Sequence, residues 1–429
     1  MIKKLLVLHI LLLSLYAQKI YTVDELIIEA LKNSPDINIS KLDLKGSKKR
    51  YDQQFGSYLP RVDLYADANY VHSNDMPLID PDFSDTVISG SLNVDQLLYD
   101  FGKTTGNIAN AKQNIKSFDA LLKESIIKKK RDVKLAYYNI LKNKALIRVN
   151  QESIKLNKAQ LQRSKRYFEA GIRTKVDISD AEVRLIKARI ELQNSKFDLQ
   201  NAYALLDRTV GFEQIGYTYR VYEGKIDLDQ PLYDKLPVYD LSMEEAIRYG
   251  YKNRAELQSS LYQIAAQKEL EKVTRSSYFP SLHVNGNYLK SSASDYPSFL
   301  DKDQYYAGVY LNWNLFSGGS DKARIEEQKI RTQKTSSEFR RKKLLVKEDI
   351  TKAYITLNKS KAQVKLSQNL LKLSKEKFEQ VSKQYEHGLS DYIELQEARQ
   401  GYIDAKASLV INYYDYFRAM AILDATIGR

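Results

Sequence analysis

The chain has 429 residues, a formal net charge of +13 and no cysteine. The lack of cysteine excludes disulfides, thiolate metal sites, a cysteine nucleophile and a lipid-bearing N-terminal cysteine. With only 17 glycines and 8 prolines the chain has few turn positions, so its elements must be long. A basic balance can indicate a nucleic-acid partner, but here Lys and Arg are interspersed with Asp and Glu, which favours solvated helix faces instead.

Residues 1–17 have the pattern of a secretory signal peptide. Lys3 and Lys4 precede an apolar run at 5–15, and Ala17 is a small residue at the expected cleavage position. Leu15 is not the small residue usual at its place, so the exact cleavage site stays open, as does a retained N-terminal anchor. Beyond Ala17 no stretch approaches the roughly 20 apolar residues of a spanning helix, so any further membrane segment must be a strand.

The remaining chain contains two copies of one unit. Residues 22–37 align with residues 242–257, an offset of 220, and from residue 132 onward the offset is 217 without a gap. The second offset places two glycines of each copy in register, Gly171 on Gly388 and Gly211 on Gly428. We therefore predict a first repeat at 18–211, a folded connector at 212–240 and a second repeat at 241–429.

Each repeat begins with a predicted helix, over residues 24–57 in the first and 242–277 in the second. Apolar residues recur there at helical spacing, and Thr22 or Asp24 can cap the first helix. A Tyr-x-Pro sequence then ends each helix, at Pro60 and at Pro280, because proline forces the preceding residue out of the helical region.

A β-hairpin follows in each repeat, at 61–98 and at 281–315. Apolar and polar residues alternate there, from Val62 to Tyr70 in the first hairpin and from Tyr305 to Trp313 in the second. Each hairpin thus has one apolar and one polar face, and about ten residues is the length with which a tilted strand crosses a bilayer. The alternative is a soluble sheet that covers a core.

The last part of each repeat is a pair of long helices, within 104–210 and within 319–427. Apolar residues are spaced by three and four, which is typical of a coiled coil with a narrow seam. Gly171 and Gly388 each interrupt the pattern and predict a turn between two antiparallel helices. The fold class is therefore mainly α with a small β part, in two tandem repeats.

Four strands are too few to close a barrel, and open strand edges are not tolerated in hydrocarbon. If the hairpins enter a membrane, copies of the chain must complete the sheet. Three copies would give twelve strands and a ring of helices with the same symmetry.

The chain resembles the TolC-like outer membrane efflux proteins over essentially its whole mature length. The resemblance rests on the two repeats, on the Tyr-x-Pro before the first strand, on Leu-Phe-Ser-Gly-Gly at 315–319 and on the two glycine turns. It implies a homotrimer with a 12-strand β-barrel in the outer membrane, continued by a 12-helix periplasmic α-barrel. It also implies an exit duct for a tripartite efflux or type I secretion system, with a periplasmic adaptor and an inner-membrane pump as partners.

The resemblance further implies roles for residues at the two turns. Those expected to dock the adaptor are Gly171, Ile172, Arg173, Thr174, Gly388, Leu389 and Ser390. The family's periplasmic gate, in which an aspartate is held by a tyrosine and an arginine, falls on Asp177, Tyr385 and Ser390. Serine replaces the arginine here, so the closed state lacks one charge-assisted bond or uses another cation such as Lys383.

The family's acidic constriction falls on Glu394 and Glu397, which in a trimer would form two carboxylate rings that favour cations. Their spacing alone also fits ordinary exposed helix carboxylates. For the turns, the plainer interpretation is a glycine helix cap followed by an N-cap residue, and both interpretations can hold together.

Four histidines without metal-ligand spacing or a nucleophile–base pattern give no support for an enzyme, and we expect no cofactor and no metal site. The alternative function is an exported coiled-coil structural or adhesive protein without a pore. Such a protein would not need two matched alternating hairpins. The sequence does not indicate whether the cargo is a drug, a metal ion or a polypeptide.

Overall fold

The computed structural model describes residues 19–73, 83–172, 174–213, 219–224, 226–228, 230–293 and 302–429. The predicted signal peptide and Arg173 lie outside these ranges. The chain divides into two compact units, the first made of Met1–Ser40, Leu122–Ala255 and Lys343–Arg429, the second of Lys41–Leu121 and Glu256–Lys342. Each unit combines matching segments of both sequence repeats.

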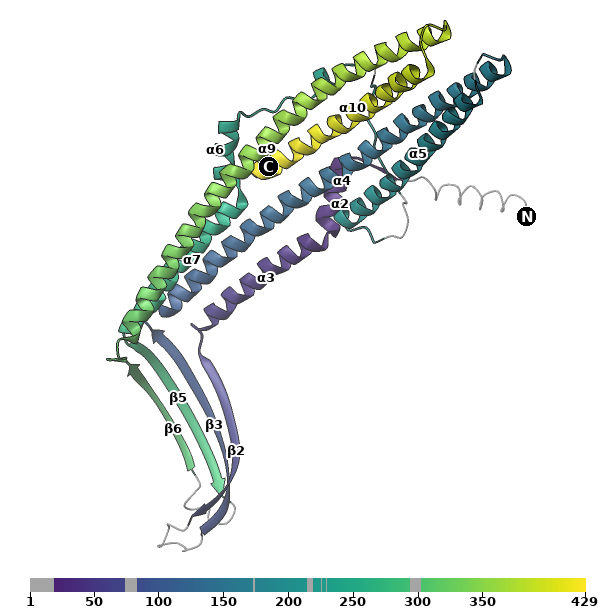
Figure 1. Ribbon diagram of the computed structural model, residues 1–429. Coiled ribbons are helices and arrows are strands. Elements are labelled where there is room, and N and C mark those ends of the chain that lie inside the picture. The colour runs from purple at the N-terminus through teal and green to yellow at the C-terminus, as the bar shows by residue number, and fades with distance from the viewer. Residues whose placement is uncertain are drawn as a thin grey trace, which may run out of the picture. The chain divides into compact units, whose positions relative to one another are not determined.

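The first unit is helical apart from two very short strands. Its elements are β1 (Lys19–Tyr21), α2 (Val23–Asn33), the start of α3 (Pro35–Gly56), most of α4 (Lys103–Glu169), α5 (Lys175–Val210), β4 (Tyr219–Val221), η2 (Tyr233–Lys235), α6 (Met243–Asn253), the second half of α9 (Ser320–Glu386) and α10 (Tyr392–Ile427). Figure 1 shows α4, α5, α9 and α10 side by side in this unit.

The structure corrects the predicted helices at 24–57 and 242–277, because each is divided in two. The first divides at Ser34 and the second at Arg254, where the backbone is extended with ψ of 124° and 116°. Pro35 explains the first break, since proline excludes a helical conformation at the residue before it. Ala255 has no such effect, so packing must produce the second break.

The C-terminal end of a long helix from the same repeat packs against each break. Gly211 caps α5 with φ of 86°, and a Cβ added to it would lie 2.8 Å from the carbonyl oxygen of Asn33. Gly428 caps α10 with φ of 91°, and its Cβ would lie 3.1 Å from the carbonyl oxygen of Asn253. Only glycine allows this close approach with positive φ, so each long helix ends against the break.

Reciprocal capping begins both short helices. Thr22 donates its backbone N–H to the Glu25 carboxylate at 2.7 Å, while the Glu25 N–H donates to the Thr22 hydroxyl at 3.3 Å. Ser242 and Glu245 make the same pair of bonds at 2.8 and 3.3 Å. Of the two candidates for the first cap, the structure therefore selects Thr22.

The connector is tied to the helices by tyrosine hydroxyls. Tyr137 of α4 donates to the carbonyl oxygen of Tyr222 at 2.6 Å. Its counterpart Tyr354 of α9 donates to that of Leu241, the first residue after the connector, at 3.2 Å. β4 of the connector also pairs in parallel with β1, from Lys19–Tyr219 to Tyr21–Val221. The sequence pattern did not predict this two-stranded sheet, because three residues are too few to show a period.

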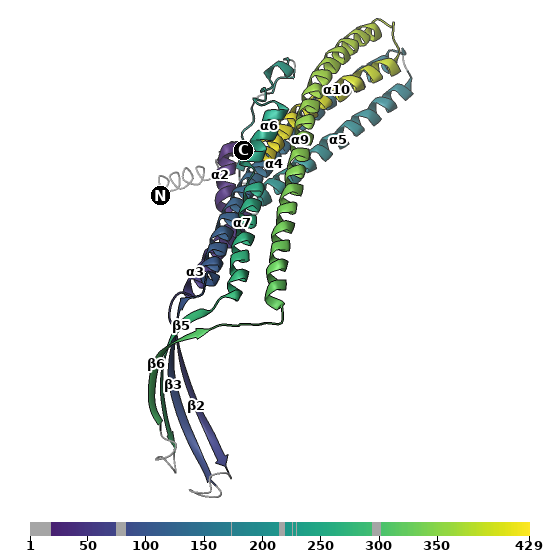
Figure 2. The same cartoon turned by 90° about the vertical axis from the view of Figure 1, so that its left-hand side faces the viewer.

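The second unit contains a four-stranded antiparallel sheet in the order β2-β3-β5-β6 (Figures 1 and 2). Its strands are β2 (Arg61–Ser73), β3 (Phe83–Tyr99), β5 (Ser281–Ala293) and β6 (Lys302–Asn312). The two predicted hairpins are thus joined through β3 and β5. The second hairpin ends earlier than expected, since Trp313 lies beyond β6 and its indole N–H donates to the Tyr278 carbonyl oxygen at 3.2 Å.

Strand register places the predicted apolar positions on one face. Leu64 pairs with Leu92, which pairs with Tyr288, which in turn pairs with Tyr305, so one row crosses all four strands. Leu64 is 78% and Tyr305 is 85% exposed. No other part of the described second unit covers these two side chains. A soluble sheet that covers a hydrophobic core would bury them instead.

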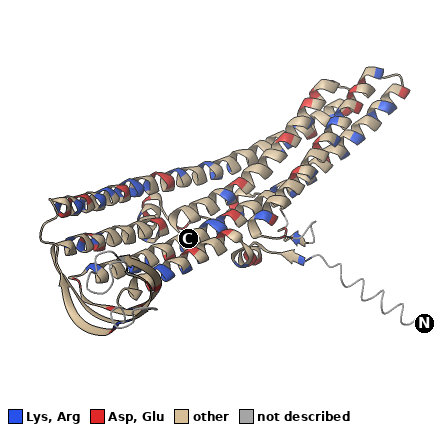
Figure 3. Ribbon diagram, turned by 90° about the horizontal axis from the view of Figure 1, so that it is seen from below, with Lys and Arg blue, Asp and Glu red and all other residues tan. Residues whose placement is uncertain are grey.

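The helical part of the second unit consists of α7 (Ala255–Arg275), the end of α3 and the first parts of α4 and α9. Serines contribute polar contacts to the packing of α7: the Ser259 hydroxyl lies 2.8 Å from that of Ser117 on α4, and the Ser260 hydroxyl accepts from Lys342 of α9 at 2.9 Å. Figure 3 shows acidic and basic residues interspersed along the long helices. None of the described helices is both long and apolar enough to cross a membrane.

Candidate functional site

The first predicted docking turn lies between α4 and α5. Gly171 has φ of 72°, its N–H donates to the Phe168 carbonyl oxygen at 2.9 Å, and the Ile172 N–H donates to the Tyr167 carbonyl oxygen at 2.8 Å. These two bonds form a Schellman motif, which satisfies the last carbonyl groups of the helix. The turn therefore holds its shape with backbone groups of its own helix.

The second turn, between α9 and α10, repeats this geometry. Gly388 has φ of 75° and donates to the Tyr385 carbonyl oxygen at 3.2 Å, and the Leu389 N–H donates to the Gln384 carbonyl oxygen at 2.8 Å. The two turns are thus equivalent in structure as well as in sequence offset.

Both turns expose apolar side chains at matching positions. Ile172 is 64% and Val176 is 66% exposed at the first turn, and their counterparts Leu389 and Ile393 are 79% and 66% exposed at the second. In a Schellman motif the residue after the glycine usually packs back on its own helix. Here this residue points outward in both turns, so it is free to contact another molecule.

The next helices begin with capping acids. Thr174 is the N-cap residue before α5, and its N–H donates to the Asp177 carboxylate at 3.2 Å. Asp391 is the N-cap residue before α10, and its carboxylate accepts from the Glu394 N–H at 2.7 Å. Asp177 and Glu394 are therefore equivalent third residues of their helices, near the positive end of the helix dipole. The family resemblance implies different roles for these two acids, the gate for Asp177 and the constriction for Glu394.

The structure joins two of the predicted site residues. The Ser390 hydroxyl donates to the Glu394 carboxylate at 2.7 Å, which gives the serine at the arginine position a partner within its own turn. Tyr385 is buried in an apolar cluster, where its ring lies 6.1 Å from that of Tyr167 and 6.4 Å from that of Tyr392. The gate formed by Asp177, Tyr385 and Ser390 remains a prediction.

The predicted constriction acids share an exposed helix face. Glu394 and Glu397 are both exposed on α10, whereas Leu395 and Ala398 are buried against the neighbouring helices. Carboxylates separated by three residues point to the same side of a helix. This placement suits a ring around an axis, although the ring itself remains a prediction.

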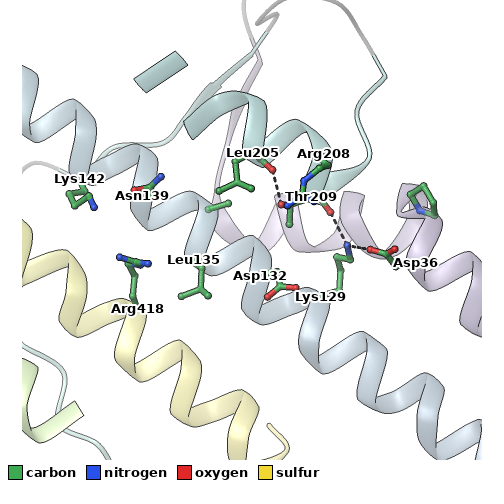
Figure 4. A pocket seen from close by; sticks show the side chains of 12 residues that line it. Asp36, Lys129, Asp132, Leu135, Asn139, Lys142, Leu205, Arg208, Thr209 and Arg418 are labelled. Carbon is green, nitrogen blue, oxygen red and sulfur yellow. Dashed lines mark hydrogen bonds and ion pairs between the residues drawn. The ribbon is translucent and has the colours of Figure 1, made fainter. Parts of the chain in front are cut away.

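A cavity of about 690 Å³ lies elsewhere in the first unit, among α3, α4, α5 and α10 (Figure 4). On one side Lys129 bonds to the Asp36 carboxylate at 2.8 Å and to the Thr209 carbonyl oxygen at 3.3 Å. On the other side burial, and then the nearby Arg418, lower the pKa of Lys142. Lys129 thus ties the start of α3 to the end of α5, which is a structural role at a helix junction.

No group of three or more possible metal ligands among His, Asp and Glu occurs in the described part of the chain. Sequence reasoning also overlooked a set of buried polar residues on α10 that includes Gln396 and Arg399. A sequence signal was available. Gln396 and Arg399 are spaced on α10 so that they lie on the same buried face as Leu395 and Tyr402, although their side chains are long and polar.

Comparisons with known proteins agree with the fold. The chain is 20% identical over 402 residues to the probable efflux pump outer membrane protein TtgC of Pseudomonas putida, across 90% of this chain and 79% of that protein. It is 21% identical over 425 residues to outer membrane protein TolC of Vibrio cholerae, across 94% of this chain and 90% of that protein. The CmeC outer membrane channel of Campylobacter jejuni has the same fold, with a TM-score of 0.81 and 17% identity, across 95% of this chain and 85% of that chain.

The family model described as outer membrane efflux protein matches residues 26–211 and 251–429. These ranges include both turns and most of the two repeats. The chain therefore belongs to the outer membrane efflux protein family.

Proposed function

We propose that the chain is the channel subunit of a tripartite efflux assembly and serves as its exit duct through the outer membrane. Three copies share one twelve-strand barrel, and their long helices form a periplasmic tunnel of twelve helices. An adaptor and an inner-membrane pump open the tunnel at the helical turns. A type I secretion system uses the same kind of duct and is the second setting in which the subunit would work.

The observation that carries the proposal is the four-stranded sheet with one exposed apolar face. The row from Leu64 to Tyr305 extends across the whole sheet, and β2 and β6 are its two edges. Edge strands carry backbone groups that need partners, and in hydrocarbon only a closed barrel supplies them all. A coiled-coil adhesive protein without a pore has no use for such a sheet.

The turns supply the proposed periplasmic contacts. Exposed Ile172 and Leu389 dock the adaptor, Asp177 and Tyr385 hold the entrance closed, and Glu394 and Glu397 line a cation-favouring constriction. The matching geometry of the two turns supports a partner that meets both repeats in the same way.

The test is to extract the mature protein from outer membranes in detergent and to add it to a planar lipid bilayer. We expect a trimer that dissociates on heating in SDS and that forms cation-selective channels. A stable water-soluble monomer without conductance would overturn the proposal.

A further inference from the structure

A buried polar layer lies between α4 and α10 of the first unit, close to the turns. Its five side chains are each at most 6% exposed, and they are Gln160, Ser164, Tyr392, Gln396 and Arg399. Long polar side chains are seldom buried to this extent unless they have partners.

A hydrogen bond between the two antiparallel helices fixes which residues of α4 lie opposite which residues of α10. The Arg399 guanidinium donates to the carbonyl oxygen of Leu156 on α4 at 3.5 Å, which sets the register. Successive helical turns then follow opposite numbering on the two helices. One and two turns nearer the hairpin turns, we expect this register to place Gln396 level with Gln160 and Tyr392 level with Ser164.

Four polar atoms in this layer are buried without a hydrogen-bond partner. They are Nε2 of Gln160, Oγ of Ser164, the hydroxyl oxygen of Tyr392 and Nε2 of Gln396. All four atoms carry a hydrogen and can donate. The two amide nitrogens can only donate, whereas the two hydroxyls can donate or accept. Buried donors without an acceptor are unfavourable, so a group that accepts from all four would stabilise the layer.

The layer is also positively charged. Arg399 bonds to the Leu156 carbonyl oxygen and to the side-chain oxygen of Gln396, and both acceptors are neutral. Burial lowers the pKa of Arg399 to about 10. Tyr392 opposes this shift, and the neighbouring Arg184 and Arg163 add to it. The Asp180 carboxylate acts on Tyr392 of the layer, but Arg399 itself bonds to no carboxylate of the residues that the structure describes. A buried cation without an ion pair favours binding of an anion.

The layer belongs to one helix pair only. At the offset of 217, the counterparts of Gln160 and Ser164 on α9 are Lys377 and Val381, and the counterpart of Arg399 on α5 is Glu182. Lys377 and Glu182 are exposed. Structural needs common to both repeats therefore do not account for the layer.

We propose that this layer binds a small monovalent anion, a halide such as chloride, between α4 and α10. The Arg399 guanidinium supplies the charge, and the two amides and two hydroxyls supply the remaining hydrogen bonds. The bound ion joins the two helices next to the turns. The proposal concerns a site within one chain and does not depend on the channel function.

The first test is anomalous diffraction from crystals of the mature protein grown with sodium bromide. We expect one bromide peak per chain between Gln396 and Arg399 of α10 and Gln160 of α4. The peak should be lost in Arg399→Met and should remain in Arg189→Met, which removes an exposed arginine of α5. Ordered water alone at this position, or a peak that remains in Arg399→Met, would overturn the proposal.

The second test is thermal unfolding in sodium chloride against sodium gluconate at equal ionic strength. We expect chloride to raise the Tm by about 2 °C, because an ion that binds only the folded state stabilises it. Arg399→Met should lose this difference and Arg189→Met should keep it. If Arg399→Met does not fold, Ser164→Ala serves instead, because it removes one donor without adding volume to the buried site. An equal chloride effect in the wild type and the layer variants would contradict a halide site.

Discussion

Asp177 and Glu394 occupy the same position of their two repeats, and each is the third residue of a helix that follows an exposed turn. The N–H of Thr174 donates to Asp177, and the Ser390 hydroxyl donates to Glu394. The proposed roles differ, since Asp177 would close the entrance and Glu394 would attract cations. A matched pair of substitutions can therefore separate capping from channel function.

We predict that Asp177→Ala and Glu394→Ala each lower stability by about 0.5–1 kcal/mol, because each removes an acid from the first turn of a helix. Only Asp177→Ala should raise single-channel conductance, since only it releases the gate. Glu394→Ala should instead reduce the preference for cations in reversal-potential measurements. If both variants change conductance alike, capping alone explains the two acids.

At the scale of elements, each long helix ends with a glycine that touches a helix break. Gly211 and Gly428 both have positive φ. A Cβ added to Gly211 would meet backbone atoms of Asn33, and one added to Gly428 would meet backbone atoms of Asn253. Gly401 lies within α10, where a Cβ added to it would point into open space. The first two glycines are required by conformation and the third is not.

We predict that Gly211→Ala destabilises the protein by about 1–3 kcal/mol, because alanine is strained at positive φ and its Cβ meets the Asn33 carbonyl. Gly428→Ala should act in the same direction. Gly401→Ala should stabilise by about 0.5–1 kcal/mol, since alanine favours a helix interior. Thermal unfolding followed by circular dichroism measures all three, and a loss of stability in Gly401→Ala would contradict this account.

The exposed turns give a second prediction at this scale. Ile172→Asp and Leu389→Asp should each weaken adaptor binding about tenfold or more, because an apolar contact is replaced by a charge that must be desolvated. Folding should be unaffected because both side chains are exposed. The matched control is Val238→Asp, an exposed connector residue. Binding of the purified adaptor measures the effect, and unchanged affinity in both turn variants would exclude docking there.

At the scale of the whole molecule, the proposed barrel requires β2 of one copy to pair with β6 of the next. The chain has no cysteine, so any disulfide must come from introduced residues. We predict that cysteines scanned along β2 and β6 in pairs, beginning with Val62→Cys and Leu311→Cys, give covalent trimers on oxidation. Denaturing gels measure the products. Single-cysteine variants are the control, and dimers without trimers would indicate a different assembly.

Much of this architecture follows from sequence. Alternation from Val62 to Tyr70 predicted the strands, and Gly171 and Gly388 predicted the turns, because period and glycine act locally. The break at Arg254 could not be predicted, since it comes from contact with Gly428, a residue distant in sequence. The spacing of Gln396 and Arg399 among buried α10 positions was a usable sequence signal, but the layer itself could not be predicted, because its members become neighbours only when α4 and α10 pack.

The two Schellman turns have a consequence for evolution. Each turn obtains its backbone hydrogen bonds from the helix that precedes it, and the glycine is the residue that this conformation requires. The adjacent positions, Ile172 and Leu389, contribute outward side chains but little to the conformation. They can accept new residues without loss of the hairpin, so under the proposed docking the choice of adaptor can diversify between species while the turns keep their shape.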